Sequence, residues 1–179
     1  MSDEKVERLI IEDFTANEAE IGRYLWMLED VRERLKEAVE GIDEQGLDWQ
    51  PPYRGNSIGT LLYHIAVVEI DWLYCEVQQT EFPAQVMAML PFDMRDEAGR
   101  LTAVRQIPLS EHIQRLDDCR AYLLDIFNGM SLAQFRRVRH LPDYDVTPEW
   151  VLYHLIQHET EHLGQIMEMI QQRESLDES

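Results

Sequence analysis

The chain has 179 residues and carries 35 acidic against 16 basic side chains, so its formal net charge is −19. A chain of this length can bury one sizeable core, and we expect a single domain over residues 1–179. A surface this acidic repels nucleic-acid phosphates and anionic lipids, which argues against nucleic acid and membrane surfaces as partners.

Three further features predict a cytoplasmic protein. Residues 1–5 lack the basic and apolar regions of a signal peptide. No apolar run approaches the roughly 20 residues needed to span a bilayer. Cys75 and Cys119 are isolated in a long chain and form no disulfide framework. The reducing cytoplasm is therefore the expected compartment.

A first long helix is predicted to begin at residues 15–18, where Thr15 and Glu18 have the spacing of a capping box. Apolar side chains then recur at alternating intervals of three and four residues, the pattern of a bundle helix. These positions are Ile21, Tyr24, Leu28, Val31, Leu35, Ala38 and Ile42. Gly41 and Gly46 mark the end of this helix.

A second helix is predicted after the proline-containing loop 48–55, with Asn56 or Ser57 as its cap. Its residues 58–70 are apolar on most sides, which is typical of a buried helix. The polar side chains within it are Thr60, Tyr63, His64 and Glu69.

The segment between the second and third helices, residues 81–108, is irregular. It is expected to form a short helix and a hairpin over one end of the bundle, with a turn at residues 96–99. The third helix is predicted over residues 110–127, where apolar side chains again recur at helical spacing.

The C-terminal part is predicted to hold a short helix followed by the longest one. Ser131 and Gln134 form a capping box for the short helix. Thr147, Pro148 and Glu149 supply a cap, a first-turn proline and an acid at the positive end of the helix dipole. This helix is expected to reach about residue 172. No β-strand pattern of any length is present, so the predicted fold is all-α, most simply a four-helix bundle.

Three histidines follow one another at four-residue intervals in this last helix: His154, His158 and His162. Neighbours at this spacing share one helix face, and two imidazoles so placed can bind one divalent metal ion. His158 and His162 lie at the border of the apolar face, whereas His154 lies towards the polar flank and is an outer member or a bystander. The alternative is that the pair is satisfied by hydrogen bonds at the edge of the core.

A third metal ligand has to come from another part of the chain. His64 is the natural choice because it lies in the middle of the most apolar helix, where a buried imidazole is costly without a partner. The alternative is a core histidine bonded to a carbonyl or a carboxylate. His112 and His140 stand among charged residues and are expected to be solvated.

His158, Glu159 and His162 also match the H-E-x-x-H motif of zinc peptidases, in which the glutamate is the general base. The peptidase interpretation is weak because the further ligand of either peptidase class is missing downstream and no strand could align a peptide. Glu159 nevertheless falls in the apolar sector. It is a candidate catalytic base, a residue that orients a histidine, or the partner of an arginine. Glu69 is a candidate for a similar role.

The sequence resembles the DinB/YfiT-like superfamily. The likeness is carried by residues 49–51 (Trp-Gln-Pro), 57–66 (Ser-Ile-Gly-Thr-Leu-Leu-Tyr-His-Ile-Ala) and 150–166, and it spans most of the chain. The resemblance implies an up-down-down-up four-helix bundle, often a homodimer. It also implies a divalent metal, zinc or nickel, held by one histidine of the second helix and two of the last, which are here His64, His158 and His162.

The same resemblance implies metal-dependent transfer of a low-molecular-weight thiol to a small electrophile, since the superfamily includes bacillithiol transferases and mycothiol-dependent isomerases. Metal-dependent hydrolysis is the enzymatic alternative. A non-catalytic, dimeric metal-binding stress protein is the third hypothesis. A fourth protein ligand would favour a structural metal, whereas three histidines with an open position would favour catalysis.

Overall fold

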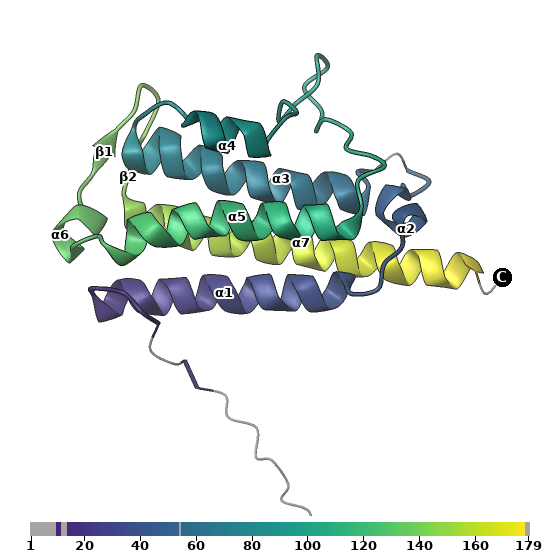
Figure 1. Ribbon diagram of the computed structural model, residues 1–179, viewed down its shortest axis with the longest axis horizontal. Helices are drawn as coiled ribbons and strands as arrows, with labels where there is room; N and C mark the ends of the chain where they lie inside the picture. Colours follow the sequence, from purple (N-terminus) through teal and green to yellow (C-terminus); the bar gives the residue numbers. More distant parts are fainter. Residues whose placement is uncertain (1–9, 12–13, 54, 178–179) are drawn as a thin grey trace, which may run out of the picture.

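Four long helices lie side by side in the computed structural model, which describes residues 10–11, 14–53 and 55–177 (Figure 1). They are α1 (Ala19–Val39), α3 (Ile58–Asp71), α5 (Leu109–Asn128) and α7 (Pro148–Asp177). The colours of Figure 1 show that α1 and α7 run in one direction and α3 and α5 in the other. The predicted all-α bundle with up-down-down-up topology is confirmed.

Shorter elements join these helices: α2 (Glu44–Asp48), η1 (Trp72–Gln78), α4 (Ala84–Met89), α6 (Leu132–Phe135), β1 (Arg139–His140) and β2 (Asp145–Val146). The segment η1 is a π-helix that continues α3. The strands β1 and β2 pair antiparallel, with Arg139 opposite Val146. The prediction of no strand was therefore wrong for two residues on each side, a length too short to give a periodic pattern.

The helix ends follow local chemistry in most places. The Ser57 hydroxyl accepts a hydrogen bond from the Thr60 N–H at 3.2 Å and so caps α3. The capping box of α6 is also present, with Ser131 and Gln134 bonded to each other's backbone. Gly41 takes φ +77°, a left-handed conformation that ends the helical path just after α1.

The capping box predicted at the start of α1 is wrong. The helix begins at Ala19, and its N-cap Glu18 makes no side-chain cap bond. The Glu18 carboxylate instead accepts from the Leu132 N–H at 3.4 Å, at the start of α6. A free N–H of a neighbouring helix therefore competes for the side chain that the local pattern assigned to its own helix.

The core runs the length of the bundle and is built from the predicted apolar faces. In α1, Ile21, Leu28 and Leu35 are fully buried, as their spacing indicated. The other fully buried side chains of the long helices include Leu25, Leu62, Ile65, Ile70, Leu116, Leu123, Phe127, Val151, Leu152 and Ile166. α3 packs against both α5 and α7, and α1 packs against the same two helices.

Because η1 extends α3, the continuous helix Ile58–Gln78 has 21 residues and a mean hydropathy of 1.3 over 18 of them. The expectation that no apolar segment is long enough to span a bilayer was therefore wrong, because this helix reaches that length. Of that 18-residue window, 78% is buried inside the bundle. Burial of this extent is what the core helix of a bundle shows.

The excursion between α3 and α5 forms the predicted short helix, α4, and a hairpin closed by pairing of Arg95 with Leu101. It lies beside α3 rather than over one end of the bundle (Figure 1). Tyr63 of α3 attaches it, since the hydroxyl donates to the Phe92 carbonyl at 2.7 Å and accepts from the Phe92 N–H at 2.9 Å.

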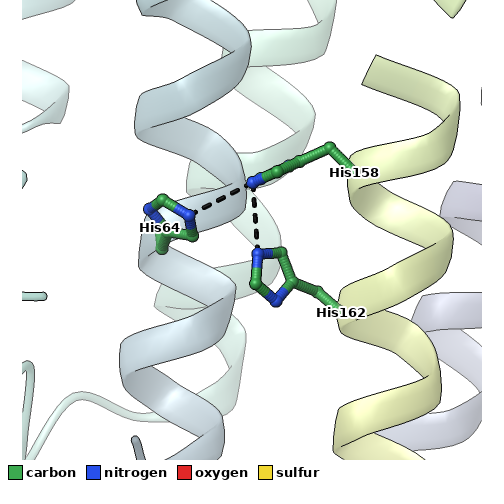
Figure 2. Close-up of side chains that lie close together, drawn as sticks. All are labelled: His64, His158 and His162. Atoms are coloured by element: carbon green, nitrogen blue, oxygen red, sulfur yellow. Dashed lines mark hydrogen bonds between the residues drawn. The ribbon is translucent and has the colours of Figure 1, made fainter. Parts of the chain in front are cut away.

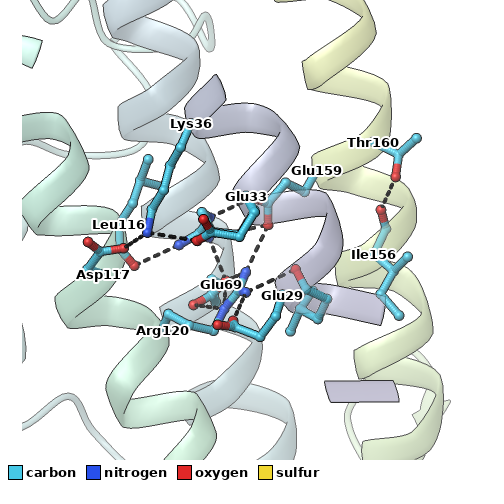
Figure 3. Close-up of polar contacts among 12 residues, drawn as sticks. Glu29, Glu33, Lys36, Glu69, Leu116, Asp117, Arg120, Ile156, Glu159 and Thr160 are labelled. Atoms are coloured by element: carbon cyan, nitrogen blue, oxygen red, sulfur yellow. Dashed lines mark hydrogen bonds and ion pairs between the residues drawn. The ribbon is translucent and has the colours of Figure 1, made fainter. Parts of the chain in front are cut away.

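A buried ion cluster joins the four long helices: Arg32 of α1, Glu69 of α3, Arg120 of α5 and Glu159 of α7 (Figure 3). All four side chains are at most 3% exposed. Arg32 Nε lies 2.6 Å from one Glu159 oxygen, and Arg120 Nη2 lies 2.7 Å from Glu69 and 2.9 Å from the other Glu159 oxygen. Arg32 also donates to Glu69 at 3.1 Å.

The cluster holds the Glu69 carboxylate ionised in the core. Desolvation acts to raise the pKa of Glu69, but the guanidiniums of Arg120 and Arg32 outweigh it, so the pKa lies below its ordinary value. Each guanidinium also donates to a backbone carbonyl, Arg32 to that of Leu116 at 2.8 Å and Arg120 to that of Leu28 at 3.1 Å. Two buried cations and two buried anions thus pair away from water, and the partly exposed carboxylate of Glu29 in α1 also pairs with Arg120, 2.5 Å from its Nη1.

Replacing Arg120 by Met is expected to lower the free energy of unfolding by about 3–5 kcal/mol, because two carboxylates would remain buried without full compensation. Urea denaturation followed by tryptophan fluorescence measures the loss. The matched control is Arg136→Met. Arg136 makes an exposed ion pair with Glu20, and its loss should change stability by no more than about 1 kcal/mol. Equal stability of the two variants would contradict a stabilising role for the cluster.

Candidate metal centre

Three imidazoles converge between α3 and α7: His64 approaches from α3, and His158 and His162 approach from α7 (Figure 2). His158 Nε2 lies 3.1 Å from His64 Nε2 and 3.1 Å from His162 Nε2. The ligand nitrogens of all three lie within 4.8 Å of one another. The structure therefore brings together the three residues singled out as metal ligands, although each ring remains only half-buried.

The buried ion cluster positions these rings. Glu159 follows His158 directly, and successive helical residues point about 100° apart. The Glu159 carboxylate is bonded to arginines in the core, so His158 is turned to the edge that faces α3. Glu69, five residues after His64, is bonded to the same arginines. Both helices are thus held in a register that places His64 opposite the pair on α7.

Burial keeps the imidazoles neutral. It lowers the pKa of His158 to about 3 and of His64 to about 4, with repulsion from His162 as the next cause in each case. The pKa of His162 is also lowered, mainly by burial. A neutral imidazole has one N–H and one nitrogen with a free lone pair. It is through this lone pair that the ring binds a metal.

Hydrogen bonding alone does not satisfy this arrangement. His158 Nε2 faces two other Nε2 atoms, but a neutral ring offers there either one proton or one lone pair. Nitrogens bound about 2.05 Å from one tetrahedral ion lie roughly 3.3 Å apart, close to the two separations seen here. The donor set therefore fits a divalent ion.

One ring has an outer partner that selects its tautomer. His162 Nδ1 lies 3.0 Å from Gln165 Oε1, an oxygen that can only accept. The Nδ1 atom therefore carries the proton, which leaves the Nε2 lone pair directed at the other histidines.

Glu159 has both oxygens bonded to the guanidiniums of Arg32 and Arg120, and its side chain is 2% exposed. These contacts match one of the three roles predicted for Glu159, that of the partner of an arginine. Its use as a catalytic base stays a prediction. Glu69 has the same kind of contacts, so both acidic residues on apolar helix faces belong to the ion cluster.

His154 lies outside the triad. Its ring stacks on Trp150, with centroids 5.0 Å apart and planes 7° apart, and its centroid is 4.5 Å from that of Trp72. It contacts the triad only through His158, with 6.0 Å between the ring centroids. His154 is thus an outer neighbour that connects the triad with a group of aromatic side chains.

The expectation that His112 is solvated was wrong. Its side chain is buried, and its Nε2 atom occupies space that a side chain at Gly59 would need, 3.2 Å from the Cβ position. Charged sequence neighbours misled the prediction because they lie on other faces of α5. The four-residue interval from His112 to Leu116 places the histidine on the buried face.

Sequence reasoning also missed Arg32 and Arg120. Each lies four residues after a core leucine, Leu28 and Leu116, and therefore on the buried face of its helix. Two glutamates on apolar faces required buried cations, so the helical spacing of these arginines was a usable signal.

The sequence profile of the DinB superfamily matches residues 27–166. The chain belongs to the DinB superfamily. The fold also resembles a conserved protein from Enterococcus faecalis, with 15% identity, TM-score 0.64, and coverage of 82% of this chain and 92% of the other. YfiT from Bacillus subtilis has 16% identity, TM-score 0.61, and coverage of 94% and 93%. YfiT is described as a probable metal-dependent hydrolase with an unusual four-helix bundle topology.

None of the curated proteins matches the chain. Membership in the DinB superfamily confirms the resemblance inferred from the motifs. At 15–16% identity the two solved structures establish the fold alone.

The lowered pKa values predict the acid behaviour of the metal-free protein. His64 and His158 should titrate near pH 4 and pH 3, whereas the urea-unfolded chain should titrate near 6.5. The unfolded chain then binds more protons below pH 6.5, so the stability these rings contribute is complete above that pH and is lost as the pH falls through the folded values. NMR titration of the imidazole carbon-bound protons measures both states. A folded-state titration near 6.5 would contradict the burial of the triad.

Proposed function

We propose that this DinB-superfamily protein is a metal-dependent enzyme that transfers a low-molecular-weight thiol to a small electrophile. In this proposal His64, His158 and His162 hold the ion, with zinc or nickel as the expected metals. The observation that carries the proposal is the convergence of three neutral imidazoles with no fourth ligand in the cluster among the described residues.

A site with three protein ligands is the arrangement of catalytic rather than structural zinc. All three rings are half-buried, so a small molecule has access to one side of the cluster. A divalent ion held there would supply Lewis acidity that lowers the pKa of a small thiol or of water towards neutrality. The role of the protein is to keep the three imidazoles neutral and convergent.

The contacts around the triad favour a thiol over water as the nucleophile. In the part of the chain that the structure describes, no carboxylate hydrogen-bonds any of the three rings, and Glu159 is committed to two arginines. A divalent ion could generate hydroxide from bound water without a base, but ester or amide hydrolysis also has to deliver a proton to the leaving group, a step ordinarily assisted by a side-chain acid or base. A thiol that binds as its thiolate has already lost its proton and needs no such base. Its sulfur forms the new bond to the electrophilic carbon as the leaving group departs.

Hydrolysis is the second candidate, favoured by the description of YfiT as a probable metal-dependent hydrolase. The two reactions differ in one measurable requirement. Thiol transfer depends on the concentration of an added thiol, whereas hydrolysis proceeds without it.

The metal assignment is tested by elemental analysis of tag-free protein. His64→Ala and His162→Ala are each expected to hold about one equivalent of metal less than wild type, since two imidazoles rarely retain an ion that three bind. The matched control is His140→Ala. His140 is 78% exposed and pairs with Asp145, so its replacement should leave the metal content unchanged. Unchanged content in both triad variants would refute the ligand assignment.

Turnover is tested with a panel of small thiols and a chromogenic electrophile. His158→Ala should lower kcat/KM by at least about 100-fold, equivalent to about 2.7 kcal/mol of transition-state stabilisation. His140→Ala should retain wild-type activity. Ester or amide cleavage without added thiol would instead support hydrolysis. A metal-bound protein with neither activity, whose melting temperature falls in His158→Ala, would support the non-catalytic alternative.

A further inference from the structure

We propose a second metal site, separate from the histidine triad, formed by Asp71, Cys75 and Glu76 where α3 passes into η1. The three side chains each offer one ligand atom, and these atoms lie within 4.8 Å of one another. The site rests on its own contacts and requires neither the triad nor thiol transfer.

The π-helix η1 explains why two carboxylates five residues apart meet. In an α-helix, residues five apart point about 140° away from each other. A π-helix closes each turn with a bond five residues back, so residues 71 and 76 fall on the same side. Cys75 lies between them, and its Sγ is 3.6 Å from Asp71 Oδ1. Segments of π-helix within α-helices are frequent at functional sites.

Glu76 gives a second, independent indication of a bound cation, because one of its buried oxygens has no hydrogen-bond partner. Its side chain is buried, with the residue only 6% exposed. One oxygen accepts from the Tyr144 hydroxyl at 2.7 Å, whereas the other, Oε2, is buried with no hydrogen-bond partner. A buried acceptor without a partner costs about 1–3 kcal/mol, and more when it is charged. A proton on Oε2 would remove the charge but leave a buried hydroxyl without an acceptor.

The cluster also lacks a counter-charge from the protein. No basic side chain among the described residues contributes to the pKa of Asp71 or Glu76, and burial raises both. Burial, followed by repulsion from Asp71 and Glu76, raises the pKa of the Cys75 thiol to about 11. The arginine-bound glutamates of the core show the contrast, because each has two guanidiniums. A divalent cation would supply the positive charge that no basic side chain in the described part of the chain provides to Asp71, Cys75 and Glu76.

The donor types select the class of metal. One sulfur with two carboxylates suits zinc and its softer analogue cadmium, whereas magnesium and calcium take oxygen ligands alone. Cys75 is exposed, so an ion can enter from solvent.

The site adjoins a cavity of about 670 Å³ whose wall includes Trp72, Tyr144 and Trp150. Glu76 holds Tyr144 by the hydroxyl, so an ion that fixes Glu76 also fixes one wall of this cavity. Trp72 and His154 are in ring contact, which connects the cavity to the neighbourhood of His158. The second metal would therefore order a pocket close to the triad.

Cadmium titration of the full-length protein tests the proposal, because bound thiolate gives an ultraviolet charge-transfer absorption that imidazole does not. Wild type should bind two equivalents and show the sulfur band. Cys75→Ser should bind one equivalent without the band, and Asp71→Asn should weaken the sulfur-band equivalent by more than about tenfold. Cys75 is exposed, so its replacement should leave the fold intact, as a circular dichroism melt verifies.

His64→Ala separates this proposal from the proposed function. If both sites exist, the variant loses one equivalent and keeps the sulfur band. Binding of one equivalent by wild type with no band overturns the second site while leaving the triad in place. One equivalent with a sulfur band, unchanged in His64→Ala, supports the second site and refutes the triad. The control Cys119→Ser should keep the band because Cys119 is in the core, and a band that persists in Cys75→Ser overturns the proposal.

Discussion

The bundle depends on one buried electrostatic constraint, the ion cluster of Arg32, Glu69, Arg120 and Glu159. Each long helix contributes one member, so no helix can slide or rotate without separating charges that water does not reach. Apolar packing is tolerant of small shifts, whereas paired guanidinium and carboxylate groups require defined directions and distances. The cluster therefore sets the register that the hydrophobic stripes leave loosely defined.

The triad shows what this register achieves. His64 and the pair on α7 come from segments 94 residues apart, yet their nitrogens meet at hydrogen-bond distance. Glu69 and Glu159 belong to the same two helices and are bonded to common arginines, so the ion cluster and the triad are two levels of one helix contact. The charged side chains lie in the core, and the three neutral histidines lie at the outer edge of the contact between α3 and α7. The charged groups that hold the helices together are thus separate from the three histidines at the edge of the same contact.

Much of the fold was predictable because helix periodicity, caps and proline positions are local signals. The apolar stripe of α1, the Ser57 cap and the capping box at Ser131 appear in the structure as expected. The failures have a common cause. Glu18 bonds a neighbouring helix, and His112 lies on a face that its sequence neighbours do not share. In both cases a contact distant in sequence outweighed a local preference.

The sequence by itself determined the fold class and which histidines to examine, because an i, i+4 pair and a lone imidazole in an apolar helix are visible as spacing and composition. Only the tertiary structure decided how they meet. It paired both glutamates with Arg32 and Arg120, and it continued α3 as the π-helix that aligns Asp71 with Glu76. The physical reason is that periodicity reports which face of a helix is buried, whereas register, partner choice and helix type depend on packing against the other helices.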